Sequence, residues 1–323
     1  MGDLWDVGRK ELEDSFSSRR FLIVLGLFLV LSLASVYIGI DNYQTQIDNF
    51  GEGSSIYGQQ PEMPSLIEIF EPLLRFNLAL TAGLLGLFLS YNFISKEREA
   101  GTMELLLSYP VYRDEIINGK LVAGVFTVAL TLLISFLVSS GLAIFMLDKI
   151  PSIEVVSRLS FIWLGTTLYI TFFLSLGTLL STVFRSQWRS LMIGVLLLIA
   201  FIGTPFIAGI AAPFIYPHEE PASEGAAVEG RPEVDMGEKD RPQREIVEEK
   251  RQWFISVVSN FSPSENYNSF NAAMLGTMQE TEDGFEPTFT ESLRTALDPL
   301  IYLVSQTAFV LTGSYLVFLR QDL

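Results

Sequence analysis

The chain has 323 residues, of which 49% are hydrophobic and 18% are charged, and its formal net charge is −16. It contains no cysteine, which excludes disulfides, thiolate metal sites and cysteine nucleophiles. Its only histidine, His218, lies outside the apolar runs. Zinc hydrolysis at an HExxH motif, haem ligation by paired histidines and a serine–histidine dyad within the membrane therefore all lack a residue that they require.

Six apolar runs approach or exceed the roughly 20 residues that cross the hydrocarbon core of a bilayer. They predict an all-α membrane protein with six transmembrane helices, five of them within 21–216 and the last within 299–323. At the last span, Asp298 is positioned to cap the helix and Pro299 to occupy its first turn. The expected spans are 21–40, 74–95, 121–147, 159–184, 190–215 and 299–319.

Residues 1–20 precede the first span and alternate between apolar and charged positions at helical spacing. Leu4, Trp5, Leu12 and Phe16 would share one face, opposite a face of acidic and basic side chains. This pattern predicts an amphipathic elbow helix that lies in the plane of the membrane interface. No small-residue cleavage site follows the first apolar run, so we expect no cleavable signal peptide.

The segment 96–120, between the second and third spans, is unusually dense in charge for a short loop. Gly101 suits a tight bend where the chain leaves the second span. Pro110 should end a short helix that begins near Thr102, and a second helix should begin near Arg113 and continue into the third span. The pattern alone is also typical of an ordinary interfacial helix, so its role stays open at this point.

The distribution of basic residues predicts the orientation of the spans. With the N-terminus inside, the inner segments hold eleven Lys and Arg residues, whereas the outer flanks and short loops hold only Arg75, Lys149 and Arg158. We therefore expect a multi-pass plasma-membrane protein of a prokaryote, with both termini and 96–120 in the cytoplasm.

The negative charge gathers on the predicted outer side. Segment 217–299 carries a net charge of −11 and segment 41–72 a net charge of −6. Three interpretations are open: a solvated outer surface, adaptation to high salt as in a halophilic archaeon, and attraction of a cationic ligand. The presence of only six lysines beside fifteen arginines favours the second of these.

The outer segment 217–298 divides into two parts. Residues 217–250 are rich in Pro, Gly and Glu, so we expect them to be mobile. Residues 251–298 should form short helices, the first ended by Pro263 and the second within SENYNSFNAAMLGTM. The apolar face of the first should pack on the membrane domain, a second copy or an extracytoplasmic partner. Its members are Ile246, Trp253, Phe254, Val257, Val258 and Phe261.

The string GTMELLLSYPVYRDEIINGK resembles the GTLELLLSxPVSRxxIxxGK segment of the transmembrane subunits of ABC-2-type ABC transporters. It is most similar to the permeases grouped with the copper-enzyme-maturation component of nitrous-oxide reductase assembly. The six spans, the elbow and the long outer segment match that family over essentially the whole chain. Two positions depart from its pattern: Met103 replaces a common leucine, and Tyr112 replaces the serine that can form a capping box with Glu115.

The resemblance implies that 96–120 contains the coupling helix that docks into a groove of a separate ATPase subunit. This chain has no G-x-x-x-x-G-K-[ST] phosphate loop, so ATP and Mg are expected on that partner, and we expect no cofactor, metal or enzymatic activity here. The residues that the resemblance assigns to coupling are Glu97, Glu99, Gly101, Thr102, Glu104, Leu106, Leu107, Pro110 and Arg113.

The resemblance also implies a dimer of permeases, most simply a homodimer in the lipid bilayer, with two ATPase subunits and no nucleic acid. Asn77, Thr81 and Thr204 would line the pathway between the two permeases, although hydrogen bonding between helices is an alternative role. Two functions remain open. The chain moves cargo with energy from ATP, or it relays ATP hydrolysis to an extracytoplasmic partner, which would dock at 251–298, without moving cargo.

Overall fold

The computed structural model describes residues 19–51, 64–74, 79–101, 113–217, 241–277 and 287–320. The predicted elbow helix, the centre of the coupling segment and most of the predicted mobile stretch therefore lie outside the described residues. Within the described ranges the chain is helical and contains no strand. The elements are α2 (Arg19–Gly51), η2 (Leu66–Phe70), α3 (Ala79–Ser90), α4 (Ser95–Glu99), α6 (Arg113–Leu147), α7 (Ile153–Val183), α8 (Gln187–Ile202), α9 (Thr204–Ile215), α10 (Arg241–Asn260), α11 (Pro263–Leu275) and α12 (Phe289–Arg320).

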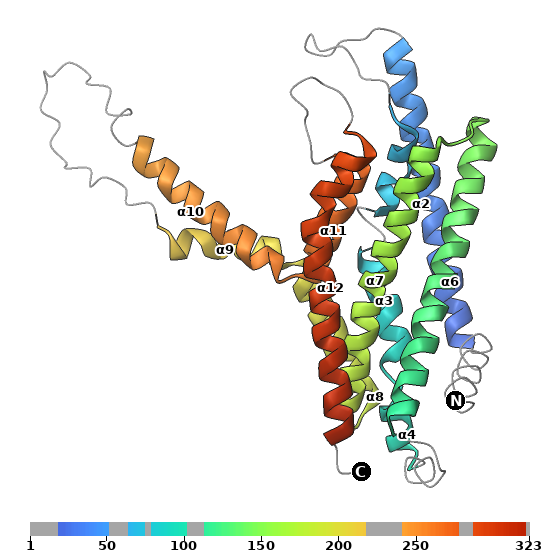
Figure 1. Cartoon of the computed structure of the whole chain (residues 1–323), viewed down its shortest axis with the longest axis vertical. Helices are drawn as coiled ribbons and strands as arrows, with labels where there is room; N and C mark the ends of the chain where they lie inside the picture. The colour runs from blue at the N-terminus through green and yellow to red at the C-terminus, as the bar shows by residue number, and fades with distance from the viewer. Residues whose placement is uncertain are drawn as a thin grey trace, which may run out of the picture.

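The long helices form an elongated bundle (Figure 1). The start of α2, the end of α12, α4 and the start of α8 lie at the same end of it, and α9 and α10 project together from its side. Among the described residues, α2, α6, α7 and α12 are each long and apolar enough to cross a membrane. The prediction of an all-helical, multi-pass membrane protein is confirmed.

Two of the six predicted spans look different in the structure. The second is represented by α3, whose 12 residues are fewer than a complete span needs. The fifth consists of α8 and α9, which are bent by 59° and count as one span only if the pair crosses together. The exact number of six spans stays a prediction.

The bend between α8 and α9 follows from Pro205. A proline has no N–H for the carbonyl four residues earlier, here that of Phe201. The hydroxyl of Ser262 donates to this carbonyl oxygen instead, at 2.6 Å. Ser262 also caps α11, because its side chain accepts a hydrogen bond from the backbone N–H of Glu265. One buried hydroxyl thus joins the bend to the start of α11.

The beginning of α12 corrects the expected boundary of the last span. The helix starts at Phe289, so Asp298 and Pro299 lie within it and do not form its first turn. Thr288 precedes the helix, and both its N–H and its hydroxyl donate to the Glu291 carboxylate at 2.8 Å. This cap acts ten residues earlier than the expected Asp-Pro signal, and the helix continues through Pro299 at the expense of one backbone hydrogen bond.

Helix α7 is the central element of the bundle and packs against α3, α6, α8, α11 and α12. Its contact with α3 is close because glycines lie on both helices. A Cβ atom added to Gly86 would come within 2.6 Å of the Ile170 carbonyl oxygen, and Gly177 faces the side chain of Ser90. Small residues allow this backbone approach, which is typical of helix packing in membranes.

The outer helices confirm part of the prediction for 251–298. Helix α10 spans Arg241–Asn260 and Pro263 begins α11, so two helices with a proline boundary are present, but α10 begins ten residues before 251 and includes the end of the stretch 217–250 that was expected to be mobile. Phe254 contacts Tyr216 edge to face, at 6.2 Å between ring centroids. Trp253 is 61% exposed, so of the three expected contacts, packing on the membrane domain of its own chain is not observed for this residue, and a second copy or a partner stays a prediction. Helix α11 is more deeply packed than a surface cap, since Tyr267 and Phe270 are almost fully buried.

Candidate coupling site

Helix α4 is fixed to the end of α7 by a single buried hydroxyl. The backbone N–H groups of Ile94 and Ser95 both donate to Ser181 Oγ, at 2.9 and 3.0 Å. Ser181 is fully buried. Arg98 adds a bond from Nη1 to the carbonyl oxygen of Thr182 at 3.1 Å. The first turn of α4 therefore cannot move without the end of α7.

An ion pair connects α4 to the start of α6. Lys120 Nζ lies 3.0 Å from Glu97 Oε1, and the side chains are only 8% and 17% exposed. The lysine also lies over the Phe93 ring, 5.8 Å from its centroid. Because Glu97 precedes Gly101 and Lys120 follows Arg113, the pair ties together the two ends of the coupling segment. Glu97, one of the residues that the resemblance assigns to coupling, is thus engaged within the chain.

Glu99 connects α4 to the start of α8. Its carboxylate accepts from the backbone N–H of Gln187 at 3.0 Å and from Gln187 Nε2 at 2.6 Å. A carboxylate at a helix N-terminus satisfies an unpaired N–H and complements the helix dipole. These hydrogen bonds, first the one from the backbone N–H, lower the pKa of Glu99 from its ordinary value. We call Glu97, Glu99, Lys120, Ser181 and Gln187 the α4 junction.

The other coupling residues have different outcomes. Gly101 follows α4 with φ +67°, which confirms the predicted tight bend. Arg113 is the first residue of α6, which confirms the predicted start of that helix. The remaining five lie outside the described residues, and their contact with an ATPase stays a prediction. These five are Thr102, Glu104, Leu106, Leu107 and Pro110.

The predicted pathway residues do not form one described site. Asn77 lies outside the described residues. Thr81 is half-buried on α3, between the exposed Leu80 and the buried Ala82. Thr204 begins α9, and its hydroxyl donates at 3.0 Å to the carbonyl oxygen of Ala200, in the last turn of α8. Their role in a pathway stays a prediction.

Comparison with known proteins identifies the family of the chain. The profile of the family described as "ABC-2 family transporter protein" matches residues 5–323. The chain belongs to the ABC-2 family. This confirms the resemblance found in the coupling segment, and α4 and its junction are thus features of an ABC-2 permease.

Two curated relatives of this ABC-2 chain are both called "Probable ABC transporter permease protein NosY". The protein of Stutzerimonas stutzeri is 33% identical over 138 residues, which cover 42% of this chain and 44% of the relative. The protein of Pseudomonas aeruginosa is 31% identical over 151 residues, which cover 47% and 48%. The matches span less than half the length of these relatives.

The ABC-2 chain has a second junction, at the opposite end of α7, around Arg158. All five of its N–H groups are used. Nε and Nη2 contact Glu154 Oε1 at 3.4 and 3.0 Å, Nη1 contacts the Met274 carbonyl oxygen at 2.8 Å and Ser292 Oγ at 2.9 Å, and Nη2 also contacts the Pro287 carbonyl oxygen. Arg158 is 5% exposed. We call Arg158, Glu154, Met274, Pro287 and Ser292 the Arg158 junction.

From the sequence, Arg158 served only to orient the spans. A charge at the edge of an apolar run is a signal that it needs partners, and Glu154 lies four residues before it, but the other three partners, Met274, Pro287 and Ser292, lie more than 100 residues away in the chain. Helical spacing could have identified Glu154 but not these three distant partners.

A tyrosine pair between the two junctions was also missed. The rings of Tyr169 and Tyr267 stack with centroids 4.3 Å apart. The Tyr169 hydroxyl donates to the Ala79 carbonyl oxygen at 2.8 Å, and the Tyr267 hydroxyl lies 2.9 Å from Thr166 Oγ1. Burial raises the pKa of Tyr267, so this hydroxyl stays neutral. The pair joins α3 and α11 to α7.

Proposed function

We propose that this chain is the membrane subunit of an ABC transporter and receives movement at its coupling segment from a separate ATPase subunit. ATP and Mg bind to that subunit, and two of them act on a pair of permeases, most simply two copies of this chain. The observation that carries the proposal is the α4 junction, where one short helix is bonded to α6, α7 and α8. A push on the coupling segment would therefore reach three helices at once.

The physical requirement for such coupling is stiffness. A loose loop would absorb a displacement, whereas α4 has bonds of three kinds to its surroundings: backbone to hydroxyl, ion pair and helix cap. The ion pair is largely withdrawn from water, where the attraction between opposite charges is stronger than at the surface. The tight bend at Gly101 then leads the chain directly from α4 into the segment that should meet the ATPase.

The proposal is tested by placing a charge in the predicted docking face. Leu106→Asp should abolish co-purification with the ATPase subunit and stimulation of its activity in liposomes, because a charge buried in a helix–groove contact is strongly unfavourable. The matched control is Ile246→Asp, an exposed apolar position on α10, which should leave both unchanged. Normal ATPase binding and stimulation in Leu106→Asp would contradict the proposal.

A second function is favoured by the continuity of α7. This unbroken helix of 31 residues carries Ser181 of the α4 junction near one end and Arg158 near the other. At 1.5 Å per residue the two positions are about 35 Å apart along a single rod. Movement at the α4 junction could thus be relayed to α11 and to an extracytoplasmic partner without transfer of cargo.

The two functions differ in where ATP should change the distance between two copies. The chain has no native cysteine, so single spin labels can be placed at Phe88→Cys on α3 and at Ile246→Cys on α10, both at exposed positions. Transport predicts an ATP-dependent change between the two Phe88 positions as the pathway opens. The relay predicts a constant distance there and a change between the two Ile246 positions.

A further inference from the structure

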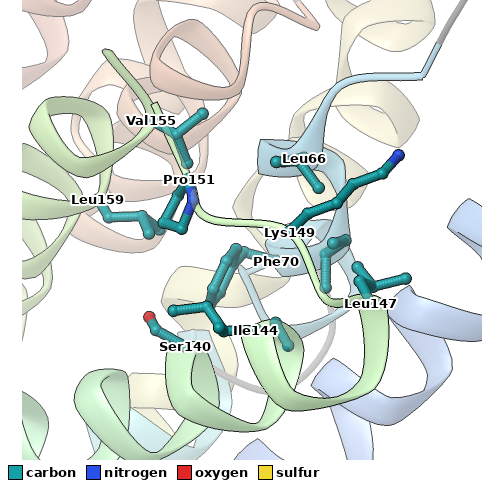
Figure 2. Close-up of a pocket in the computed structure, with 11 residues that line it drawn as sticks. Leu66, Phe70, Ser140, Ile144, Leu147, Lys149, Pro151, Val155 and Leu159 are labelled. Carbon is teal, nitrogen blue, oxygen red and sulfur yellow. The ribbon is translucent and has the colours of Figure 1, made fainter. Parts of the chain in front are cut away.

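A hollow opens between the end of α6, η2 and the start of α7 (Figure 2). The hollow is shallow and open: its volume is about 20 Å³, and it reaches about 320 Å³ only when the solvent space in its mouth is counted. Nine of its eleven lining residues are apolar, among them Phe70, Ile144, Leu147 and Leu159; the polar ones are Ser140 and Lys149. The lining therefore suits a hydrocarbon chain better than a polar solute.

The hollow lies at the level where the apolar part of the bundle ends. On α6 the apolar run ends at Leu147, and on α2 it ends at Ile40. Three residues after Ile40, the hydroxyl of Tyr43 accepts a hydrogen bond from Lys149 Nζ at 3.2 Å. Tyrosines and snorkelling lysines gather at this boundary between hydrocarbon and headgroups. A lipid chain at this depth would have its phosphate close to Lys149.

Three exposed apolar side chains lie close in the sequence to lining residues of the hollow. Phe145, Ile150 and Ile153 are 86%, 87% and 82% exposed. They lie on the end of α6, on the connection and on the start of α7, which are the same elements that form the hollow. Single exposed apolar residues are ordinary, but three on the elements that form an apolar hollow favour a lipid contact there.

Lys149 supplies the polar half of the site. It is exposed, and Figure 2 shows its side chain lying beside Leu66 at the edge of the hollow. Its ammonium group has three N–H donors, of which Tyr43 takes one. Asp148 is its neighbour in sequence, yet among the described residues no ion pair joins Lys149 to a carboxylate. The cation is thus available to a phosphate, in an outer region whose charge is otherwise mostly negative.

We propose that this hollow binds one anionic phospholipid, with an acyl chain between α6 and α7 and the headgroup phosphate on Lys149. The site is independent of the coupling segment, which lies at the other end of α6. It assigns a ligand class to a surface that neither transport nor relay requires.

The test uses the detergent-purified chain and native mass spectrometry, with phosphatidylglycerol and phosphatidylcholine of identical acyl chains as probes. Phosphatidylglycerol should bind more tightly, and Lys149→Met should remove about a fivefold preference, which is the contribution of one lysine near anionic headgroups. Lys96→Met, an exposed lysine of α4, should keep the preference. An unchanged preference in Lys149→Met would overturn the proposal.

Two further experiments distinguish binding of the acyl chain from binding of the headgroup phosphate. Ala143→Phe narrows the hollow and should weaken the binding of both lipids; undiminished binding in a variant that elutes as folded protein would show that no acyl chain enters. Inorganic phosphate, in place of lipid, should give no saturable adduct. A phosphate adduct that disappears in Lys149→Met would assign the site to soluble phosphate and overturn the lipid assignment. Because Lys149 is exposed, its variant decides the question even if Ala143→Phe fails to fold.

Discussion

The two junctions on α7 hold their charges in different ways. At the Arg158 junction a single guanidinium is 5% exposed and uses all five of its donors, and only one of its four partners is ionised. At the α4 junction the contacts come from three separate groups: the Glu97–Lys120 ion pair, the Ser181 hydroxyl and the Glu99 carboxylate. Glu99 is exposed. The guanidinium of Arg158 is buried, so water cannot readily replace a hydrogen bond that it loses. Water can replace the hydrogen bonds of the exposed Glu99 carboxylate.

This difference suggests different mechanical roles. A buried cation with fixed partners can leave its place only at a large cost in free energy, so the Arg158 junction should act as a rigid attachment of α11 and α12 to α7. A junction with an exposed carboxylate can break and re-form bonds at little cost. The α4 junction is therefore the end at which a partner could change the conformation.

The largest expected effect is that of Arg158→Met, which would break the rigid attachment. It removes the cation but keeps much of the apolar stem, and it leaves the Met274 and Pro287 carbonyls without this donor. We expect a loss of about 3–5 kcal/mol of stability, measured as a lower midpoint of thermal aggregation in detergent. Arg294→Met, which removes an exposed arginine of α12, should stay within about 0.5 kcal/mol of the native chain. Equal midpoints for both variants would refute the comparison.

A smaller and more local effect is expected at the α4 junction. Lys120→Met leaves the Glu97 carboxylate poorly exposed and without its ion pair, which should cost about 3 kcal/mol but affect α4 and the start of α6 rather than the whole bundle. Hydrogen exchange should rise in those two segments, while Lys96→Met leaves it unchanged. In the double variant with Glu97→Gln, part of the loss should be recovered because no buried charge remains. Faster exchange throughout α11 would show that the two junctions are not separate units.

The third largest loss of stability is expected when the Ser262 hydroxyl at the α8–α9 bend is removed. Ser262→Ala removes both the donor to the Phe201 carbonyl and the cap of α11, each typically contributing about 1 kcal/mol. Ser262→Thr keeps the hydroxyl and should retain most of the stability. The measurement is the urea or thermal midpoint together with exchange at the first turn of α11. An alanine variant as stable as the threonine variant would mean that neither bond matters.

The smallest effect is expected for Glu99, the most adjustable contact. Its pKa is lowered in the folded chain, so its contribution is fully present above the ordinary glutamate pKa of about 4.3 and is lost as the pH falls through the lower folded value. Hydrogen exchange at the Gln187 amide should thus be constant from neutral to mildly acidic pH and rise only below that range. Glu99→Gln should abolish this pH dependence. If hydrogen exchange at the Gln187 amide began to rise near neutral pH, its pH dependence would belong to a group other than Glu99.

The helical class, the second outer helix and the bend at Gly101 could be predicted because each depends on residues close in sequence. The start of α12 could also have been predicted, because Thr288 and Glu291 have the spacing of a capping box. The polar residues between them and Asp298 instead led us to expect a loop. The junctions could not be predicted. Glu97 and Lys120 are separated by 23 positions, and Arg158 meets residues contributed by two later helices, so only the packing of the bundle defines these contacts.

The bend at Gly203 has a consequence for the surrounding lipid. Helix α8 has 16 residues, or about 24 Å at 1.5 Å per residue, which is shorter than a hydrocarbon core of about 30 Å. One of its faces is open, with Trp188, Met192 and Leu196 each about two-thirds exposed or more. Where α8 crosses without α9, bilayer that contacts this face would thin to match it, at a cost that rises with every ångström of mismatch. Two such faces brought together would share one thinned patch, so membrane elasticity itself would draw two copies into contact along α8.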